Sequence, residues 1–259
     1  MRAVKAFLLV LCCLAVSDAW SCDEGTGMYN ATQVDAGQGA VIVRDTSGYV
    51  YFLIGSSWHR MSSTEFNHAS IGPAGLWATS NSGNKVYKYI AGNFRIVTSG
   101  QAMQQVDAGG NGQVVGVYTE NNYCLRSTSA SAYSGSGSLT WTSLSKSMTY
   151  ISCGPYGCWG VIKTDQIFFT RNMSPTSCDP SEWSEIDGAA VMVEVGTDGK
   201  VFVVNRTGMI WERTGITAST PQGTGWNHIS VCLKVKHVSY DLGTMWVVTD
   251  IGLLLKCKR

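Results

Sequence analysis

Short stretches in which apolar and polar residues alternate recur along the chain, and they come in pairs separated by a turn that contains glycine. Alternation with a period of two is typical of a half-buried β-strand, and two such strands around a glycine turn predict a hairpin. No long stretch places apolar residues at helical spacing. The six copies of the hairpin are VDAGQGAVIV at 34–43, ASIGPAGLWAT at 69–79, VDAGGNGQVVGV at 106–117, ISCGPYGCWGV at 151–161, VEVGTDGKVFVV at 193–204 and VSYDLGTMWVV at 238–248.

Two further strands complete each unit. A third apolar strand follows about ten residues after each hairpin, and an aromatic residue opens a fourth strand before the next copy. Six units of four strands, each about 40 residues long, predict an all-β fold, a six-bladed β-propeller of four-stranded antiparallel blades. The opening aromatic residues are Trp20, Trp58, Phe94, Trp141, Trp183 and Trp226.

The two ends of the chain are predicted to close the ring. The last strand, LLLKCK, has no aromatic strand after it, and the first strand, WSC, has no hairpin before it. If the N- and C-terminal strands pair, they complete the sixth blade and bring Cys22 close to Cys257. A closed ring buries both apolar faces of every blade.

The first residues have the pattern of a secretory signal peptide. A basic N-terminus precedes an apolar run from Ala6 to Val16, and small residues lead up to Ala19. This run is too short to span a membrane as a helix, and no later segment is apolar enough. We therefore expect residues 1–19 to be removed, and residues 20–259 to form a single secreted, extracellular propeller without membrane insertion.

The chain carries almost no net charge. It has 19 Lys+Arg against 18 Asp+Glu, a formal net charge of +1, and no run of basic residues. A nucleic-acid-binding protein needs a positively charged surface to neutralise phosphates. Composition therefore argues against a nucleic-acid partner.

Seven cysteines remain after the predicted cleavage. One pair flanks a hairpin turn at facing strand positions, one pair stands on the two strands that close the ring, and a third pair comes from adjacent units. We therefore expect three disulfides, because exported proteins usually have oxidised cysteines. The predicted pairs are Cys153 with Cys158, Cys22 with Cys257, and Cys124 with Cys178.

Cys232 is the cysteine left over. It is either a buried apolar side chain or available to pair between chains in a homo-oligomer, and we favour the first alternative. Zinc binding is a poor alternative, because the chain has no two CxxC pairs.

No residue stands out as a catalytic group. The chain has no GxSxG motif and no phosphate-binding loop, and its histidines lie in different units without the spacing of a metal or catalytic pair. We expect loop or packing roles for the histidines and no enzymatic activity. The four histidines are His59, His68, His228 and His237.

Several segments of the units resemble the tectonin repeat, and residues 20–259 as a whole are similar to the fish-egg lectins of that family. Phe94 stands where the repeat usually has tryptophan, and Asp241 stands where it has glycine. The matching segments are QVDAG at 105–109, GPAGLW at 72–77, SCGP at 152–155 with GCW at 157–159, GITAS at 215–219 with GTGW at 223–226, and SYDLG at 239–243 with WVV at 246–248.

The resemblance implies a secreted lectin that binds N-acetylglucosamine-type sugars. Its expected partners are N-acetylglucosamine-containing glycans, including bacterial surface polysaccharide, and its expected role is innate defence by multivalent recognition and agglutination. The alternative is a structural egg-envelope or extracellular protein-interaction module without sugar activity. No cofactor is expected to be required.

Polar residues of the glycine turns are the candidates for sugar contacts. The carboxylates beside the turns alternate with Ser70, Ser152 and Ser239 in successive units, so they suit three other roles equally. They can line the central channel, accept hydrogen bonds from backbone, or bind a structural calcium ion through oxygen ligands. The opening tryptophans are expected to pack between blades rather than against sugars. The sugar-binding candidates are Asp35, Asp107, Asn111, Tyr156, Glu194 and Asp198.

Three sequons of the form Asn-X-Ser/Thr predict N-linked glycosylation of an exported chain. The acceptor residues are Asn30, Asn172 and Asn205.

Overall fold

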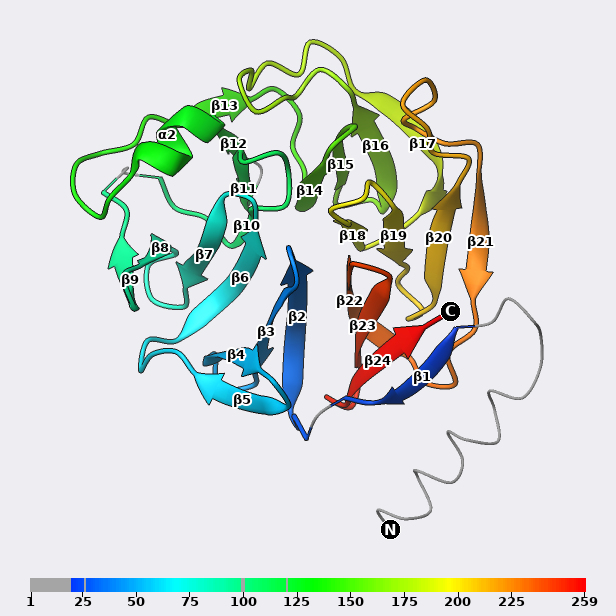
Figure 1. Ribbon diagram of the computed structural model, residues 1–259. Helices are drawn as coiled ribbons and strands as arrows, with labels where there is room; N and C mark the ends of the chain where they lie inside the picture. Colours follow the sequence, from blue (N-terminus) through cyan, green and yellow to red (C-terminus); the bar gives the residue numbers. More distant parts are fainter. Residues whose placement is uncertain (1–19, 26, 99–100, 120) are drawn as a thin grey trace.

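The computed structural model describes residues 20–25, 27–98, 101–119 and 121–259. These residues form a ring of six sheets, each with four antiparallel strands, and we call the sheets blades I to VI (Figure 1). The predicted six-bladed propeller is confirmed. The predicted signal peptide, residues 1–19, lies outside the described residues. Within these ranges, no helix is long and apolar enough to cross a membrane.

The blades follow one another in chain order around the ring. Counted outward from the ring axis, the first three blades contain β2 (Ala31–Gly37), β3 (Ala40–Asp45), β4 (Val50–Ile54) and β5 (Ser57–Arg60); β6 (Phe66–Gly72), β7 (Gly75–Ser80), β8 (Val86–Ile90) and β9 (Asn93–Ile96); and β10 (Gln105–Asp107), β11 (Val114–Tyr118), β12 (Asn121–Leu125) and β13 (Thr142–Leu144).

The other three blades have the same order, except that the outermost strand of blade VI comes from the N-terminus. They contain β14 (Tyr150–Gly154), β15 (Gly157–Val161), β16 (Gln166–Thr170) and β17 (Ser184–Ala189); β18 (Met192–Val195), β19 (Val201–Val204), β20 (Ile210–Thr214) and β21 (Gly225–Ile229); and β22 (Val235–Asp241), β23 (Thr244–Thr249), β24 (Leu254–Lys258) and β1 (Ser21–Glu24).

The ends of the chain close the ring as predicted. Strand β1 pairs antiparallel with β24, which places Cys22 opposite Cys257, and a disulfide joins them. Both ends of the folded ring therefore lie in blade VI (Figure 1).

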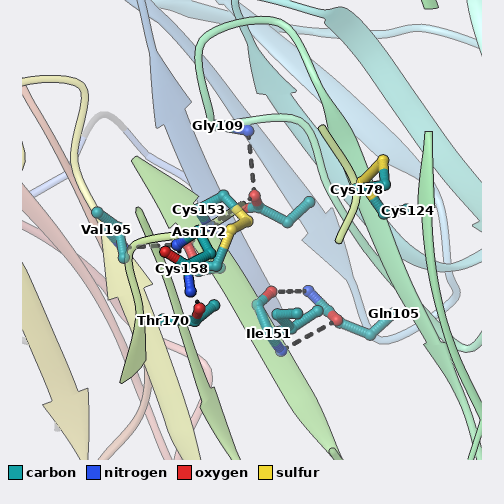
Figure 2. The surroundings of a disulfide bond; sticks show 12 residues. Gln105, Gly109, Cys124, Ile151, Cys153, Cys158, Thr170, Asn172, Cys178 and Val195 are labelled. Carbon is teal, nitrogen blue, oxygen red and sulfur yellow. Dashed lines mark hydrogen bonds between the residues drawn. A yellow bond between two sulfur atoms is a disulfide. The ribbon is translucent and has the colours of Figure 1, made fainter. Parts of the chain in front are cut away.

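The other two predicted disulfides are also confirmed. Cys153 and Cys158 bridge the β14–β15 hairpin, and a second bridge joins β12 to the segment between β16 and β17, where Cys124 pairs with Cys178 (Figure 2). The expected burial of Cys232 is wrong, because this residue is exposed in the segment between β21 and β22.

The core lies between neighbouring blades. Among the described residues, six apolar clusters each join one blade to the next, and the opening aromatic residues pack against them. Trp141, for example, is buried and packs edge to face against Trp77, with ring centroids 6.3 Å apart. This contact agrees with the expected packing role.

Close approach of neighbouring blades explains the repeated turn glycine. A Cβ atom on Gly37 would lie 2.3 Å from the carbonyl oxygen of Ile71, and one on Gly72 would lie 2.3 Å from the carbonyl oxygen of Ala108. Only glycine fits such contacts. In blade VI the position is occupied by Asp241, whose carboxylate joins the turns of two neighbouring blades.

One short helix, α2 (Ser127–Ala132), lies in the long link between β12 and β13 (Figure 1). The Lys88 amine of blade II donates a hydrogen bond to the Ala130 carbonyl oxygen at 2.6 Å. This contact fixes the helix over the outer part of blades II and III.

Candidate functional site

The three predicted carboxylates Asp35, Asp107 and Glu194 lie on the innermost strands, and only 5–6% of each residue is exposed. They alternate with serines in a closed circle of hydrogen bonds that we call the central ring. Each member accepts a backbone N–H from the next blade. The six bonds are Ile71 to Asp35 (2.7 Å), Ala108 to Ser70 (2.9 Å), Cys153 to Asp107 (3.0 Å), Val195 to Ser152 (3.1 Å), Tyr240 to Glu194 (3.4 Å) and Ala36 to Ser239 (2.8 Å).

Asp107 shows how fully these oxygens are used. Its carboxylate accepts hydrogen bonds from the backbone N–H of Gly109 and of Cys153 and from the Ser152 hydroxyl. Burial raises its pKa to about 6 despite these donors. Burial, together with the neighbouring carboxylates, also raises the pKa of Asp35 and of Glu194 well above the ordinary value. This placement favours the role in which the acids line the centre and bind backbone.

A second layer of side chains fills the centre below the ring. The Tyr150 hydroxyl lies 3.0 Å from Nε2 of His68 and 3.0 Å from Nε2 of His237, although the three residues come from blades II, IV and VI. Burial lowers the pKa of His237 to about 3 and that of His68 well below its ordinary value. Both histidines are therefore neutral at physiological pH. Their packing role was expected, but their convergence was not, because no local spacing reveals it.

Glutamine side chains tie this second layer to the next blade. The Gln105 amide both donates to the Ile151 carbonyl oxygen (2.8 Å) and accepts from the Ile151 N–H (3.3 Å), as Figure 2 shows. Gln33 makes the same pair of bonds with Ala69. The centre of the ring is thus a polar network that joins the blades, and within the described residues Nδ1 of His237 is the atom of this second layer that is buried without a hydrogen-bond partner.

A structural calcium ion was one of the roles that the sequence left open for the carboxylates beside the turns. Within residues 20–25, 27–98, 101–119 and 121–259, no group of three or more His, Cys, Asp or Glu side chains is arranged to hold a metal ion.

The other three predicted residues lie on turns at one rim of the ring. Tyr156 and Asp198 come together, because the Tyr156 ring packs against the Gly199 turn so closely that a Cβ on Gly199 would lie 2.5 Å from it. Asp198 also forms an ion pair with Lys200 at 3.7 Å. Asn111 is exposed on the β10–β11 turn of blade III, apart from that pair.

A hollow of about 290 Å³ opens between blades IV and V, and we call it the IV–V groove. Its wall is almost entirely apolar and aromatic, with one amide side chain. Pockets of this composition are typical of small-molecule sites, in which apolar surface binds the ligand and a few polar groups orient it. The lining residues are Ile167, Gly188, Ala189, Val203, Asn205, Trp211 and Trp226.

A β-bulge in blade IV makes the space for this groove. Ile186 pairs with Ile167 and Ala189 with Gln166, so the two residues between them on β17 have no partner on β16. One of these is Gly188, whose φ of 118° lies in the region that favours glycine. Small residues at the end of β17 therefore stand where a larger side chain would fill the space.

Two tryptophans of blade V form the aromatic walls. Trp226 packs edge to face against Trp159 and donates a hydrogen bond from Nε1 to the Asp187 carbonyl oxygen of blade IV at 2.6 Å. Trp211, on β20, lies against His228 with ring centroids 4.9 Å apart. Both tryptophans are only partly buried. Trp226 thus has the expected packing role and also borders the groove.

Trp211 was missed by the sequence analysis, although its position carries a signal. In each unit, the residue at this position of the third strand packs in the space between its own blade and the preceding blade, and most of these residues are aromatic. Trp211 is the largest of them, and it faces the bulged strand. The equivalent residues are Tyr51, Tyr87, Tyr123, Phe168, Trp211 and Leu255.

Asn205 provides the amide of the groove. Its Oδ1 accepts hydrogen bonds from the Thr207 N–H (3.1 Å), the Thr207 hydroxyl (2.8 Å) and the Met209 N–H (2.9 Å). In the described part of the chain, no hydrogen bond engages its Nδ2. A planar polar group with free donors is therefore present in an otherwise apolar hollow.

A second hollow, of about 430 Å³, lies at the other end of β17. It is more polar than the IV–V groove, and carboxylates, amides and a guanidinium contribute to its wall. Among its lining residues are Arg171, Asn172, Glu182, Glu185 and Gln222.

The tectonin domain model matches residues 30–250 of this chain. The fish-egg lectin of Cyprinus carpio is 42% identical over 156 residues, which cover 59% of this chain and 65% of that protein. The perivitellin-2 31 kDa subunit of Pomacea maculata is 26% identical over 102 residues, which cover 39% of this chain and 35% of that protein. The match thus spans less than two thirds of either relative.

Solved structures show the same fold at much lower identity. A virginiamycin B lyase from Staphylococcus aureus superposes with a TM-score of 0.61 at 10% identity, and the match covers 93% of this chain and 99% of that one. At such identity the likeness shows the propeller fold alone. The family model, in contrast, covers most of the described ring, and the chain therefore belongs to the tectonin family.

Proposed function

We propose that this protein is a secreted lectin that binds N-acetylglucosamine-type sugars on microbial surfaces through the IV–V groove. The observation that carries the proposal is the groove itself, in which Trp211 and Trp226 flank a hollow that contains the Asn205 amide. The similarity to a carp protein named as a lectin supports sugar binding rather than catalysis.

The composition of the groove favours an N-acetylated sugar over a plain hexose. A hexose presents one apolar face and many hydroxyl groups, whereas an acetamido group adds a methyl and an amide. The methyl suits the apolar floor formed by residues such as Ile167 and Val203, and the amide suits the free Nδ2 of Asn205. The apolar face of the sugar ring would pack on the Trp211 indole.

The proposed biological role requires more than one site in each particle. One shallow sugar pocket typically has a Kd of about 1 mM, equivalent to about 4 kcal/mol. Linking several pockets against a dense glycan surface raises the apparent affinity by about 10² to 10⁴. We therefore propose that agglutination depends on additional pockets or on self-association, with the polar hollow beside β17 as a contact for longer polysaccharides.

Secretion is part of the same proposal. The three disulfides formed by described cysteines suit an oxidising extracellular compartment.

Titration calorimetry on protein without N-linked glycans tests the proposed function. We expect N-acetylglucosamine to bind with a Kd of about 1 mM and glucose to bind at least about tenfold more weakly, because glucose lacks the acetamido group. A glycan array with bacterial polysaccharides extends the test to natural ligands. Folded protein that binds neither N-acetylglucosamine nor any glycan on the array would exclude the lectin function and favour the protein-interaction module.

A further inference from the structure

One residue of the IV–V groove is also a predicted glycosylation site. Asn205 begins the sequon Asn205-Arg206-Thr207 on the turn between β19 and β20, and its side chain lines the groove beside Trp211. The acceptor atom for an N-linked glycan is Nδ2, and the first sugar of such a glycan is N-acetylglucosamine. The proposed ligand would therefore be covalently linked to the wall of its own site.

The orientation of the Asn205 amide suits this arrangement. All three hydrogen bonds to its side chain go to Oδ1 and come from its own turn, from Thr207 and Met209. Because the turn engages Oδ1, Nδ2 is the polar atom of this side chain that stays available beside the hollow that the residue lines. The hollow is open to solvent, so the rest of a glycan has a path outward.

The other two sequons lack this geometry. At Asn172, Nδ2 donates a hydrogen bond to the Ser181 hydroxyl at 2.6 Å, and Pro175 directly follows the sequon serine. Asn30 is exposed in the link between β1 and β2, and it does not line the IV–V groove. Asn30 therefore serves as an internal control for glycosylation without a neighbouring aromatic hollow.

We propose that an N-linked glycan on Asn205 places its own first N-acetylglucosamine in the IV–V groove and thereby closes this site to other sugars. The modification forms a bond between Nδ2 and C1 of a sugar supplied by a lipid-pyrophosphate-linked oligosaccharide. The bond from C1 to the pyrophosphate breaks, the lipid pyrophosphate leaves, and the amide nitrogen loses one proton. The inference rests on the proposed function of the groove and adds its regulation.

Covalent attachment is sufficient to fill so weak a site. A ligand held by a short link has an effective concentration in the millimolar range or above. At an effective concentration of about 10 mM, a pocket with a Kd of about 1 mM is occupied by the attached sugar about nine-tenths of the time, and free sugar then binds about tenfold more weakly. Free sugar would have to displace it, so the fully glycosylated chain has a latent groove and the unglycosylated chain has an available one.

Two enzymatic treatments of the glycosylated protein separate this proposal from simple shielding by a large glycan. An endoglycosidase that leaves one N-acetylglucosamine on the asparagine removes the bulk but keeps the groove filled. A peptide N-glycosidase removes the whole glycan and converts Asn205 to aspartate. We expect free N-acetylglucosamine to bind at least tenfold more weakly to the single-sugar form than to Thr207→Val in calorimetry, because Thr207→Val has no sequon and keeps the Asn205 amide. The released form measures the empty groove with aspartate in place of that amide.

Matched variants provide the controls. Asn205→Asp reproduces the fully released form and keeps the acceptors for Thr207 and Met209, and Thr207→Val removes the sequon but keeps the Asn205 amide. Thr207→Val is expected to bind free N-acetylglucosamine with the full affinity of the empty groove, and Asn205→Asp is expected to bind as the released form does and more weakly than Thr207→Val, because both have lost the Nδ2 donor. Asn30→Asp leaves binding as weak as in the glycosylated protein. Equal binding by the single-sugar form and Thr207→Val, or glycopeptide mass spectrometry that shows Asn205 unmodified and Asn30 modified, overturns the inference.

A separate readout distinguishes this inference from the proposed function. If Thr207→Val, which keeps the Asn205 amide and carries no glycan there, binds no N-acetylglucosamine, the proposed function fails at this groove. The position of the attached sugar is then read from the proton NMR signal of its N-acetyl methyl group. An upfield shift that disappears in Trp211→Ala places the sugar on the indole, and a methyl signal that Trp211→Ala does not change overturns the inference.

Discussion

The central ring and the IV–V groove differ in the residues that form them and in how they arise from the repeat. The ring consists of carboxylates and hydroxyls at equivalent positions of the six units, and each of them binds the backbone of the next blade. The groove consists of apolar and aromatic residues around one amide, Asn205, and it exists because one unit departs from the repeat through a β-bulge. Regularity in this chain builds the scaffold, and the irregularity opens the site.

The two regions should therefore respond differently to substitution. Changes in the central ring remove contacts between blades, so they should lower the free energy of unfolding and leave the groove of the folded molecules intact. Changes in the groove remove contacts to a ligand, so they should lower sugar affinity and have little effect on unfolding.

Opening the ring should have the largest effect on stability. Replacing Cys22 and Cys257 together with serine removes a cross-link that spans 235 residues, which the chain-entropy model values at about 5 kcal/mol. Replacing Cys153 and Cys158, which are 5 residues apart, should cost only about 2 kcal/mol. Urea unfolding measures both effects. Equal losses in the two variants would contradict the ring-closure account.

Removing one acid from the central ring should have the next largest effect. Asp107→Ala leaves the N–H groups of Gly109 and Cys153 and the Ser152 hydroxyl without their acceptor, which should lower the free energy of unfolding by about 3–4 kcal/mol. Asn111→Ala, in the exposed turn of the same hairpin, is the control and should change it little. If Asp107→Ala instead abolished sugar binding in stable protein, the division between ring and groove would be wrong.

The second layer of the centre makes the pH dependence of stability predictable. The pKa of His237 is lowered from 6.5 to about 3. Its stabilising effect on the fold is therefore complete above pH 6.5 and is lost as the pH falls from 6.5 to about 3. The pKa of Asp107 is raised from 3.8 to about 6, so its effect has the opposite sign: it stabilises fully below pH 3.8 and is lost as pH rises through 6.

His237→Gln isolates the histidine part of this dependence. Between pH 6.5 and pH 4 the wild type should lose about 3 kcal/mol more than the variant, because both proteins keep the buried His68 and only the wild type also has the buried His237 imidazole, which the unfolded chain protonates first. Urea midpoints at several pH values measure the difference. His59→Gln, at an exposed position, should follow the wild type, and a parallel pH profile for His237→Gln would contradict the burial of a neutral histidine.

The propeller fold could be predicted well from the sequence because each blade corresponds to one sequence repeat. The turn glycines, the opening aromatics and the closing cysteines Cys22 and Cys257 recur or pair at fixed places, so the blades and their closure could be read from the chain. The same regularity misled the search for a site, because polar residues such as Asp35 face the neighbouring blade's backbone. A single sequence does not show which side of a strand a neighbouring blade covers.

The groove could not be predicted by the same reasoning, because it depends on tertiary contacts across two blades. Trp211 and Asn205 belong to blade V, and Gly188 belongs to blade IV. In the sequence, only two features pointed to the IV–V groove: the extra residues at the end of β17 and Trp211, the largest aromatic residue on a third strand. Neither feature is a recognisable motif. The meeting of His68 with His237 at the centre escaped prediction for the same reason.

Within the groove, Trp211→Ala should have the larger of two effects on binding. Loss of the aromatic wall should weaken N-acetylglucosamine binding by about tenfold or more, which corresponds to about 1.4 kcal/mol. Tyr51→Ala, at the equivalent position of blade I, is the control and should leave binding unchanged. Calorimetry on both variants measures the change, and equal affinity in Trp211→Ala and wild type would exclude the groove as the sugar site.

Gly188→Ala should have the smallest effect and the most local one. A Cβ atom there would lie 3.3 Å from Nε1 of Trp226, so the indole must shift and its hydrogen bond to the Asp187 carbonyl oxygen must lengthen. We expect sugar binding to weaken by about threefold, under 1 kcal/mol, because the wall moves without being removed. The backbone cost of a positive φ is measured separately by Gly55→Ala, where φ is 62° and no atom lies within 4 Å of the new Cβ. Both variants should lose about 1 kcal/mol of stability, and only Gly188→Ala should lose affinity. If both variants bound sugar equally well, the position of the Trp226 indole would not matter for the ligand, and the groove would have one working aromatic wall instead of two.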